Sequence, residues 1–309
     1  MHNTTTSISA KLDSISVRVE DTEKTAAFLT DVMGWKRHPV KFTVEKGGYG
    51  ATTEAVFVDG NGAWLQLVPT AQTENGPAGT GLNGTFFKLN FSTDHRDELH
   101  KRITRCTTGE QQKTMVEIYE PSVDGETNLV TLRDQGWDHH ETDPDVPRID
   151  RVAIIVEDIE ASISFYTDVL GLKLHPMKFG VDPDANKGIG GFKPAFIFAN
   201  SIWLVLIQPV GAGPLLDTLK EKSDGHILEV ITEVDDLDVF YERMKSKGVG
   251  LVCLDGVTPL TDNMKSQVLE PHGDKLAYIP TDVSQGLVIE VFQRGPRSTS
   301  LIHQRDATF

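Results

Sequence analysis

Residues 12–42 read LDSISVRVEDTEKTAAFLTDVMGWKRHPVKF, and residues 149–179 read IDRVAIIVEDIEASISFYTDVLGLKLHPMKF. Aligned without a gap at an offset of 137, the two stretches are identical at 15 of 31 positions. An internal repeat determines the architecture before any local pattern does, and this period is far too long for a solenoid. Each copy is therefore predicted to begin a folded module of its own.

The predicted division of the chain follows from the repeat. A length of 309 residues suits about two domains. Residues 134–148, DQGWDHHETDPDVPR, are acidic, contain proline and lack periodicity, which indicates a connecting segment. We expect a module 1, a linker, a module 2 and a polar tail, at residues 9–137, 138–148, 149–295 and 296–309.

Each module is predicted to hold two similar units. In module 2 the alternating stretch 151–156, RVAIIV, predicts a strand, Asp158 is placed to cap a helix, and Gly171 is placed to end it. A fainter copy of this pattern begins at 227–248, and its counterpart in module 1 lies at 86–104. Further strands are expected at 54–58, 63–69, 115–119, 127–133, 195–199, 202–208, 250–254, 275–279 and 286–293. The chain is thus predicted to contain four βαβββ units in two pairs, an α+β fold.

Composition excludes several classes of partner. The net charge is −15, whereas nucleic acids and anionic membranes both attract a basic surface. The two cysteines, Cys106 and Cys253, lie in different modules and indicate a reducing compartment rather than a disulfide framework. The N-terminus has no apolar signal segment, and no run reaches transmembrane length, so a cytoplasmic protein is expected.

The repeated pattern, a strand followed by VEDIEASISFYTDVLGLK at 156–173, resembles the vicinal oxygen chelate superfamily. This superfamily includes glyoxalase I, methylmalonyl-CoA epimerase, bleomycin-resistance proteins, extradiol dioxygenases and 4-hydroxyphenylpyruvate dioxygenase. The resemblance covers residues 10–295 and implies that each pair of units curls an eight-stranded sheet into an open cup. It also implies a divalent metal in the cup, held by His, Gln or Glu on the first strands and Glu on the last.

The chain departs from that ligand pattern in both modules. In module 2 the matching positions are Arg151, Val205, Glu229 and Glu290, of which only Glu290 is the usual residue. In module 1 they are Ser14, Gln66, Lys88 and Thr131, a set without an imidazole or a carboxylate. Module 1 is therefore predicted to be structural and free of metal, and module 2 to carry the chemistry.

The residues of module 2 allow three interpretations. Non-haem iron favours two imidazoles and one carboxylate, whereas Glu229 and Glu290 alone could hold Mg²⁺ or Mn²⁺. The Arg151 guanidinium works against a cation and is expected to pair with the carboxylates in bidentate fashion. A carboxylate left without such a partner should have a raised pKa and could act as a general acid or base. The third interpretation is a structural ion-pair cluster that replaced a lost metal site.

Our leading hypothesis is metal-independent proton transfer in module 2, by lyase or isomerase chemistry. Glu229 or Glu290 would be the base, Arg151 would anchor a substrate oxyanion, and Tyr278, expected across a hairpin from Glu290, would donate to a substrate oxygen or pack in the core. No cofactor is assigned. The alternatives are a dioxygenase-like metalloenzyme with Mg, Mn or Fe at an unusual carboxylate site, and a non-catalytic protein that binds and sequesters a ligand. The expected partner is a small organic substrate with an apolar part, and the chain is expected to be a monomer or homodimer.

Two histidines recur with the repeat. His38 and His175 stand in HPVKF and HPMKF, and the recurrence favours a shared structural role over a catalytic one. Trp64 and Trp203 are expected either to line apolar cups or to belong to the core.

Overall fold

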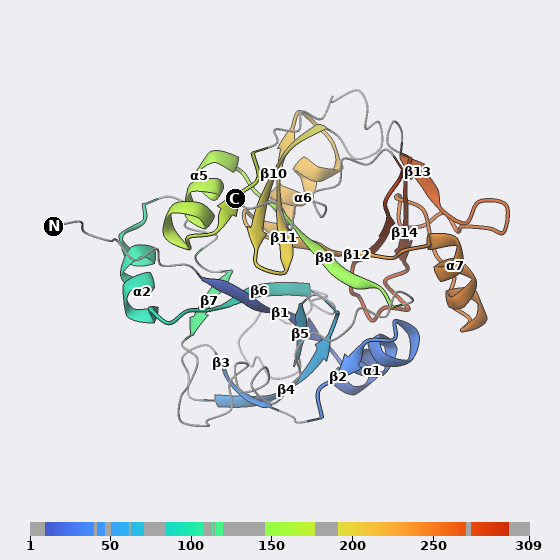
Figure 1. Ribbon diagram of the computed structural model, residues 1–309, viewed down its shortest axis with the longest axis horizontal. Coiled ribbons are helices and arrows are strands. Elements are labelled where there is room, and N and C mark those ends of the chain that lie inside the picture. Colours follow the sequence, from blue (N-terminus) through green and yellow to red (C-terminus); the bar gives the residue numbers. More distant parts are fainter. Residues whose placement is uncertain are drawn as a thin grey trace.

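The computed structural model describes residues 10–39, 42–46, 51–61, 63–70, 85–107, 113, 115–119, 146–176, 191–269 and 273–296. These residues form two mixed sheets, one from residues 11–119 and one from residues 148–293. In Figure 1 the sheets lie one above the other, with β1 and β6 of the first next to β8 and β12 of the second. The predicted α+β class and the two modules are confirmed.

Module 1 forms a seven-stranded sheet in which β2-β4-β5-β1-β6-β7 are neighbours and β3 pairs with β4. Its elements are β1 (Lys11–Val19), α1 (Thr22–Ala27), η1 (Phe28–Val32), β2 (Lys36–Arg37), β3 (Phe42–Lys46), β4 (Ala51–Asp59), β5 (Trp64–Pro69), β6 (Thr85–Ser92), α2 (Arg96–Arg105) and β7 (Val116–Tyr119).

Module 2 forms an eight-stranded sheet in the order β13-β14-β15-β12-β8-β11-β10-β9. Its elements are β8 (Arg148–Ile155), α5 (Ile159–Ser164), η2 (Phe165–Val169), β9 (Lys173–Leu174), β10 (Gly191–Ala199), β11 (Ile202–Val210), α6 (Pro214–Lys222), β12 (Ile227–Glu233), α7 (Leu237–Ser246), β13 (Gln267–Leu269), β14 (Asp274–Ile279) and β15 (Ile289–Gln293).

The two copies of the repeat fold alike because their helix signals are alike. Asp158 accepts hydrogen bonds from the backbone N–H groups of Glu160 and Ala161, at 3.0 and 3.1 Å, and so caps α5. In module 1 Asp21 caps α1 in the same way. Both helices end in a π-helical turn, η1 and η2, and the glycines that follow at 34 and 171 have positive φ.

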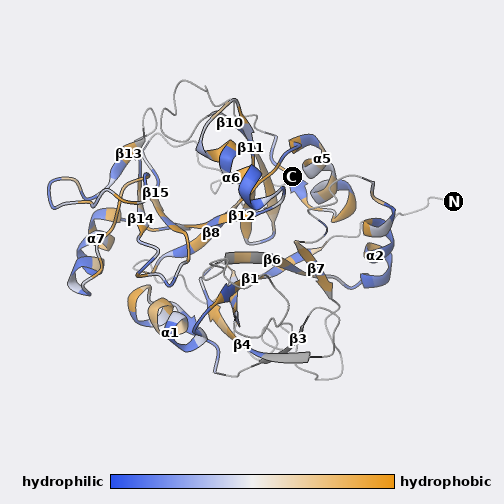
Figure 2. Ribbon diagram, turned by 180° about the vertical axis from the view of Figure 1, so that it is seen from behind, coloured by the Kyte–Doolittle hydropathy of each residue, from blue (hydrophilic) through white to orange (hydrophobic). Residues whose placement is uncertain are grey.

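One apolar core joins the modules. It contains the inward-facing residues of β1, such as Ile15 and Val17, together with Val152 and Ile154 of β8. At the junction Ile149 packs so closely on Gly60 that any side chain at position 60 would collide with it. Figure 2 shows that helices α2 and α7 carry both hydrophilic and hydrophobic residues, as helices covering a core do. Since this core occupies one face of each sheet, the opposite faces carry the remaining side chains.

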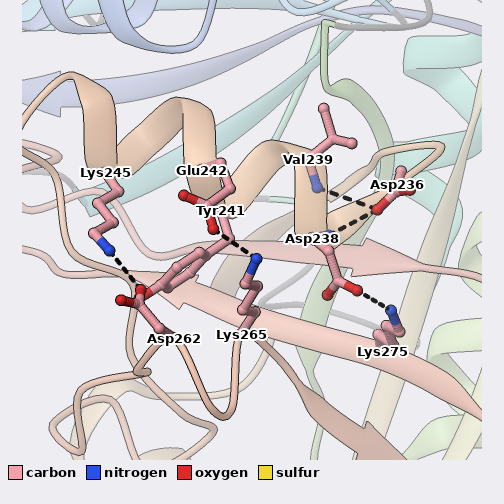
Figure 3. Close-up of polar contacts among 9 residues, drawn as sticks. All are labelled: Asp236, Asp238, Val239, Tyr241, Glu242, Lys245, Asp262, Lys265 and Lys275. Carbon is pink, nitrogen blue, oxygen red and sulfur yellow. Dashed lines mark hydrogen bonds and ion pairs between the residues drawn. The ribbon is translucent and has the colours of Figure 1, made fainter.

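Helix α7 is tied to the segment that follows it by charged pairs (Figure 3). Lys245 Nζ lies 2.5 Å from Asp262 Oδ1, Lys265 Nζ lies 2.6 Å from Glu242 Oε1, and Lys275 Nζ lies 2.9 Å from Asp238 Oδ2. We call these three pairs the α7 clasp.

The structure differs from the sequence prediction at three places. The strand expected at 250–254 is only an isolated bridge at Val252, because Pro259 faces it and cannot donate to a ladder. Strand β8 begins at Arg148, inside the predicted linker 138–148, where Arg148 pairs with Glu233 of β12. Helix α6 was not predicted, although Pro214 at its first turn is a usual start signal.

Several predicted features lie outside the described residues. These are the strand 127–133 with Thr131, residues 138–145 of the linker, and all of the tail 296–309 except residue 296. Among the described residues, no helix is both long and apolar enough to cross a membrane.

Candidate functional site

Two rows of side chains cross the open face of the module 2 sheet, the face turned away from the shared core. The first row follows the strand register through Tyr278, Glu290, Ile231, Arg151, Trp203 and Phe198. The second runs through Glu229, Ala153, Val205 and Phe196. Neighbouring strands are about 4.8 Å apart. The four predicted site residues, Arg151, Glu229, Tyr278 and Glu290, therefore lie on one face within four strands.

A pair of carboxyl groups forms the centre of the site. Tyr278 lies directly across the β14–β15 pairing from Glu290, as predicted, and its hydroxyl donates a hydrogen bond to Glu290 Oε2 at 2.7 Å. The same hydroxyl also interacts with Glu229. Both carboxyl groups are half-buried.

Burial and mutual repulsion keep a proton on this pair. Desolvation, followed by the negative charge of Glu290, raises the pKa of Glu229 to about 8, although Tyr278 and Arg151 oppose the shift. Burial likewise raises the pKa of Glu290, against the Tyr278 hydrogen bond and the Arg151 charge. The pKa of the Tyr278 hydroxyl is also raised, by burial and by both carboxylates, so it remains a donor. At neutral pH the Glu229 carboxyl group therefore holds a proton.

Arg151 does not make the bidentate pair with the carboxylates that its charge predicted. Its Nε atom lies 2.9 Å from Asp150 Oδ2, and its guanidinium centre lies 4.4 Å from the centre of the Phe292 ring. Within the described part of the chain no hydrogen bond joins it to Glu229 or Glu290. The β8–β12 register skips Asp150, so this residue forms a bulge and can face the same side as Arg151.

A second charged group lies at the end of these strands. Glu233, with only 6% of its surface exposed, accepts from both Arg148 and Arg294, and Arg294 Nε lies 2.5 Å from Glu233 Oε1. These three residues and Asp150 were missed by the sequence analysis. The alternation Glu229–Ile231–Glu233 along one strand, and the repeated Asp at 13 and 150, were the available signals.

Apolar residues cover the rest of this face. They form a cluster separate from the shared core, and it contains Ala153, Val205, Ile207, Ile231 and Phe292, with Phe192, Phe196, Leu215 and Leu228 packed against them. The site therefore combines a proton-holding pair and a guanidinium with an adjoining apolar surface.

The same face of module 1 carries a set of uncharged polar residues. Ser16 Oγ donates to Gln66 Oε1 at 2.5 Å, and Asn90 Nδ2 contacts Ser14 Oγ and Ser16 Oγ at 2.8 Å each. All four residues are buried. Ser14 and Gln66 were predicted at this face, whereas Ser16 and Asn90 were missed.

Lys88 of module 1 forms an ion pair outside the hydrogen-bonded set. Lys88, which occupies the register position of Glu229, forms an ion pair with Glu117 at 2.6 Å. The predicted fourth member, Thr131, lies outside the described residues.

The repeated histidines have a structural environment, as predicted. The His38 ring packs edge-on to Trp64 at 5.9 Å between centres, and the His175 ring packs on Trp203 at 5.6 Å. All four side chains are buried. Both Trp side chains are therefore buried, and Trp203 is a buried member of the open-face row of module 2.

The donor set of module 2 differs from the ligand set that an iron site requires. Iron sites of this kind use two imidazoles and a carboxylate, and here the face offers two carboxyl groups, a phenol and a guanidinium. No group of three or more His, Cys, Asp or Glu side chains that could hold a metal occurs among the described residues. The set does not fit iron. For Mg²⁺ or Mn²⁺ it supplies the two carboxyl groups of Glu229 and Glu290, and Glu229 would first have to lose its proton beside the positive charge of Arg151.

Comparison with known proteins gives concordant matches. Residues 11–145 and 148–278 match the family model of the Glyoxalase/Bleomycin resistance protein/Dioxygenase superfamily. The mitochondrial methylmalonyl-CoA epimerase of Mus musculus is 25% identical over 147 residues, which are 47% of this chain and 72% of that protein.

Two solved structures resemble the whole chain. A variant of 4-hydroxymandelate synthase from Streptomyces coelicolor has a TM-score of 0.58 at 14% identity and covers 94% of both chains. The Mn(II)-bound glyoxalase from Novosphingobium aromaticivorans has a TM-score of 0.50 at 14% identity, covering 93% of this chain and 83% of its own. At this identity the two structures support the fold alone.

Proposed function

The chain belongs to the Glyoxalase/Bleomycin resistance protein/Dioxygenase superfamily, and from this premise we propose that module 2 catalyses proton transfer at a carbon atom next to a carbonyl group. The reaction class is isomerase or lyase. The observation that carries the proposal is the carboxyl pair, in which the pKa of Glu229 is raised to about 8 while Tyr278 donates to Glu290. Two carboxyl groups in unequal environments provide an acid and a base at the same pH.

In the proposed mechanism Glu290 is the base and Glu229 is the acid. The Glu290 carboxylate removes a proton from the substrate carbon, and the electron pair of that C–H bond moves toward the carbonyl oxygen. Glu229 gives its proton to that oxygen, so an enol forms and the negative charge stays on the pair. Return of a proton from Glu290 to carbon, with the enol proton going back to Glu229, completes an isomerisation. In an elimination the enol proton goes back to Glu229 as the carbonyl re-forms, and the group on the neighbouring carbon leaves with its bonding electrons and takes the proton held by Glu290.

The surrounding residues support this assignment of roles. The Tyr278 hydrogen bond and the Arg151 charge both favour the ionised form of Glu290, and the Arg151 charge also favours negative charge that develops on the substrate. The apolar cluster around Ala153 and Val205 would hold the rest of the substrate and exclude water. The relationship to a methylmalonyl-CoA epimerase favours the isomerase form.

The test is exchange of carbon-bound hydrogen in D₂O, followed by proton NMR on a panel of 2-oxo acids, ketones and hydroxy ketones with alkyl or phenyl groups. Wild type should exchange at least one member. Glu229→Gln and Glu290→Gln should each slow exchange by at least about 100-fold, the usual contribution of a general acid or base. Lys88→Gln, at the matching position of module 1, should leave the rate unchanged.

Two results would contradict the proposal. Unchanged exchange in both Gln variants would remove the carboxyl pair from the mechanism. Tight binding of a panel member without exchange in wild type would instead indicate a sequestering protein.

A further inference from the structure

Three guanidinium groups lie beside the carboxyl pair, those of Arg148, Arg151 and Arg294. Arg148 and Arg294 both converge on Glu233. Arg151 does not share that carboxylate, and its ion-pair partner is Asp150.

Arg151 makes no comparable side-chain hydrogen bond among the described residues. Its shortest ion-pair contact is Nε to Asp150 Oδ2, at 2.9 Å, and neither of its two Nη atoms donates a hydrogen bond to a described residue. With 19% of its side chain exposed, the group is partly open to solvent. A guanidinium so placed lacks the second half of the bidentate contact that it is shaped to make.

The orientation of this guanidinium is fixed. It lies over the Phe292 ring at 4.4 Å, which holds the plane of the group and leaves its edge available. Arg151 stands in the same row as Glu290, with β12 between their strands, and Glu229 comes from that middle strand. An anion bound at the Nη edge would thus lie beside the proton-holding pair.

We propose that Arg151 is the carboxylate-binding residue of module 2 and that the substrates are carboxylic acids with an apolar aliphatic or aromatic body. The inference rests on the proposed function for the reaction, although not for the binding itself. The enol oxygen of the substrate can take its proton from Glu229. The Nη edge of Arg151 is therefore better matched to a substrate carboxylate, which stays charged throughout the reaction. The apolar cluster containing Ala153, Val205 and Ile231 adjoins Arg151 and would receive the body.

Isothermal titration with matched probes tests this binding without turnover. The probes are 3-phenylpropanoate and 4-methylpentanoate, each compared with its primary amide, which has the same shape and no charge. Wild type should bind at least one carboxylate about tenfold or more tighter than its amide, as expected for a charge-assisted bidentate contact. Arg151→Gln should abolish that preference and leave amide affinity unchanged, whereas Lys88→Gln in module 1 should retain it.

Three outcomes would overturn the inference: wild type binding none of the carboxylates, wild type binding acid and amide equally, or the preference surviving in Arg151→Gln. If Arg151→Gln does not fold, Arg151→Lys replaces it. This variant keeps the charge but loses the fork, and it should retain a reduced preference. The two proposals can fail separately. A preference for carboxylates without exchange that depends on Glu229 or Glu290 would contradict only the proposed reaction. Exchange that depends on these residues without a preference for carboxylates would contradict only the proposed Arg151 subsite.

Discussion

The open faces of the two sheets differ more than the modules that carry them. In module 1 the face holds a neutral, internally hydrogen-bonded set, Ser14, Ser16, Gln66 and Asn90. In module 2 the same strands carry a guanidinium and two carboxyl groups with raised pKa values, beside apolar residues. A neutral network is satisfied without a ligand, whereas a guanidinium whose Nη atoms lack hydrogen-bond partners among the described residues is not.

The features that both modules kept are those that the core requires. The acidic helix caps, the π-helical turns and the edge-on His–Trp pairs occur in each copy. These contacts fix how the first helix and the first strands pack, so a change in either copy would disturb the fold. The open faces are free of that constraint, so their side chains could diverge, and module 1 has Lys88, ion-paired with Glu117, where module 2 has Glu229.

The largest expected difference between the faces is in how stability depends on pH. The pKa of Glu229 is raised in the folded state to about 8, so the native protein binds more protons than the unfolded chain between about pH 4.5 and 8. Stability associated with Glu229 is therefore present below this window and is lost as the pH rises through it. Glu229→Gln removes this titration. From pH 4 to pH 9 the free energy of unfolding of the variant should therefore fall by on the order of 2 kcal/mol less than that of wild type.

Denaturant unfolding of both proteins across this pH range measures the effect, and curves that stay parallel would contradict it. The reverse change sharpens the comparison. Gln66→Glu places a carboxyl group in the buried neutral network of module 1. This variant should lose stability at high pH in a similar way, a loss that Gln66 does not cause in wild type.

Metal binding offers a second way to test the comparison, with an intermediate effect. Elemental analysis of the purified protein is expected to show no stoichiometric Fe or Mn. Because Arg151 places a positive charge beside Glu229 and Glu290, Arg151→Gln should tighten binding of added Mn²⁺ by about tenfold, as removal of one nearby like charge allows. Titration followed by electron paramagnetic resonance gives both affinities.

The dioxygenase-like alternative makes the opposite prediction. A stoichiometric metal in wild type, lost in Glu290→Gln, would show that the carboxyl pair is a ligand set. An Mn²⁺ affinity that does not respond to Arg151→Gln would place the ion elsewhere.

The sequence predicted the fold through the repeat, since helix caps, glycine stops and strand alternation are local signals. It also placed Arg151, Glu229, Tyr278 and Glu290 on one face, because register within a two-residue alternation can be counted. It could not predict that Asp150 would take the Nε of Arg151, since this pairing depends on a bulge in the β8–β12 ladder. Glu233 with its two arginines was missed for a related reason: its partners come from strands that are distant in sequence.

The smallest expected effect concerns the α7 clasp. A change in this clasp tests whether its residues belong to the scaffold of module 2 or to the site. Lys245 and Asp262 are exposed, and pairs of this kind contribute little to stability. Asp262→Asn should lower the melting temperature by no more than about 2 °C at low salt, with no difference in 1 M NaCl. Thermal unfolding at the two salt concentrations measures this change.

The same variant shows where the site ends. Tyr278 is positioned by two backbone hydrogen bonds to Val252, of 2.9 Å each, and these do not depend on Asp262. Hydrogen exchange catalysed by Asp262→Asn should therefore stay within about twofold of wild type, the range expected of a surface change away from the chemistry. A tenfold loss would mean that the segment between Val252 and β13 belongs to the site. The functional difference between the modules would then extend beyond the open face of the sheet to the helix that covers it.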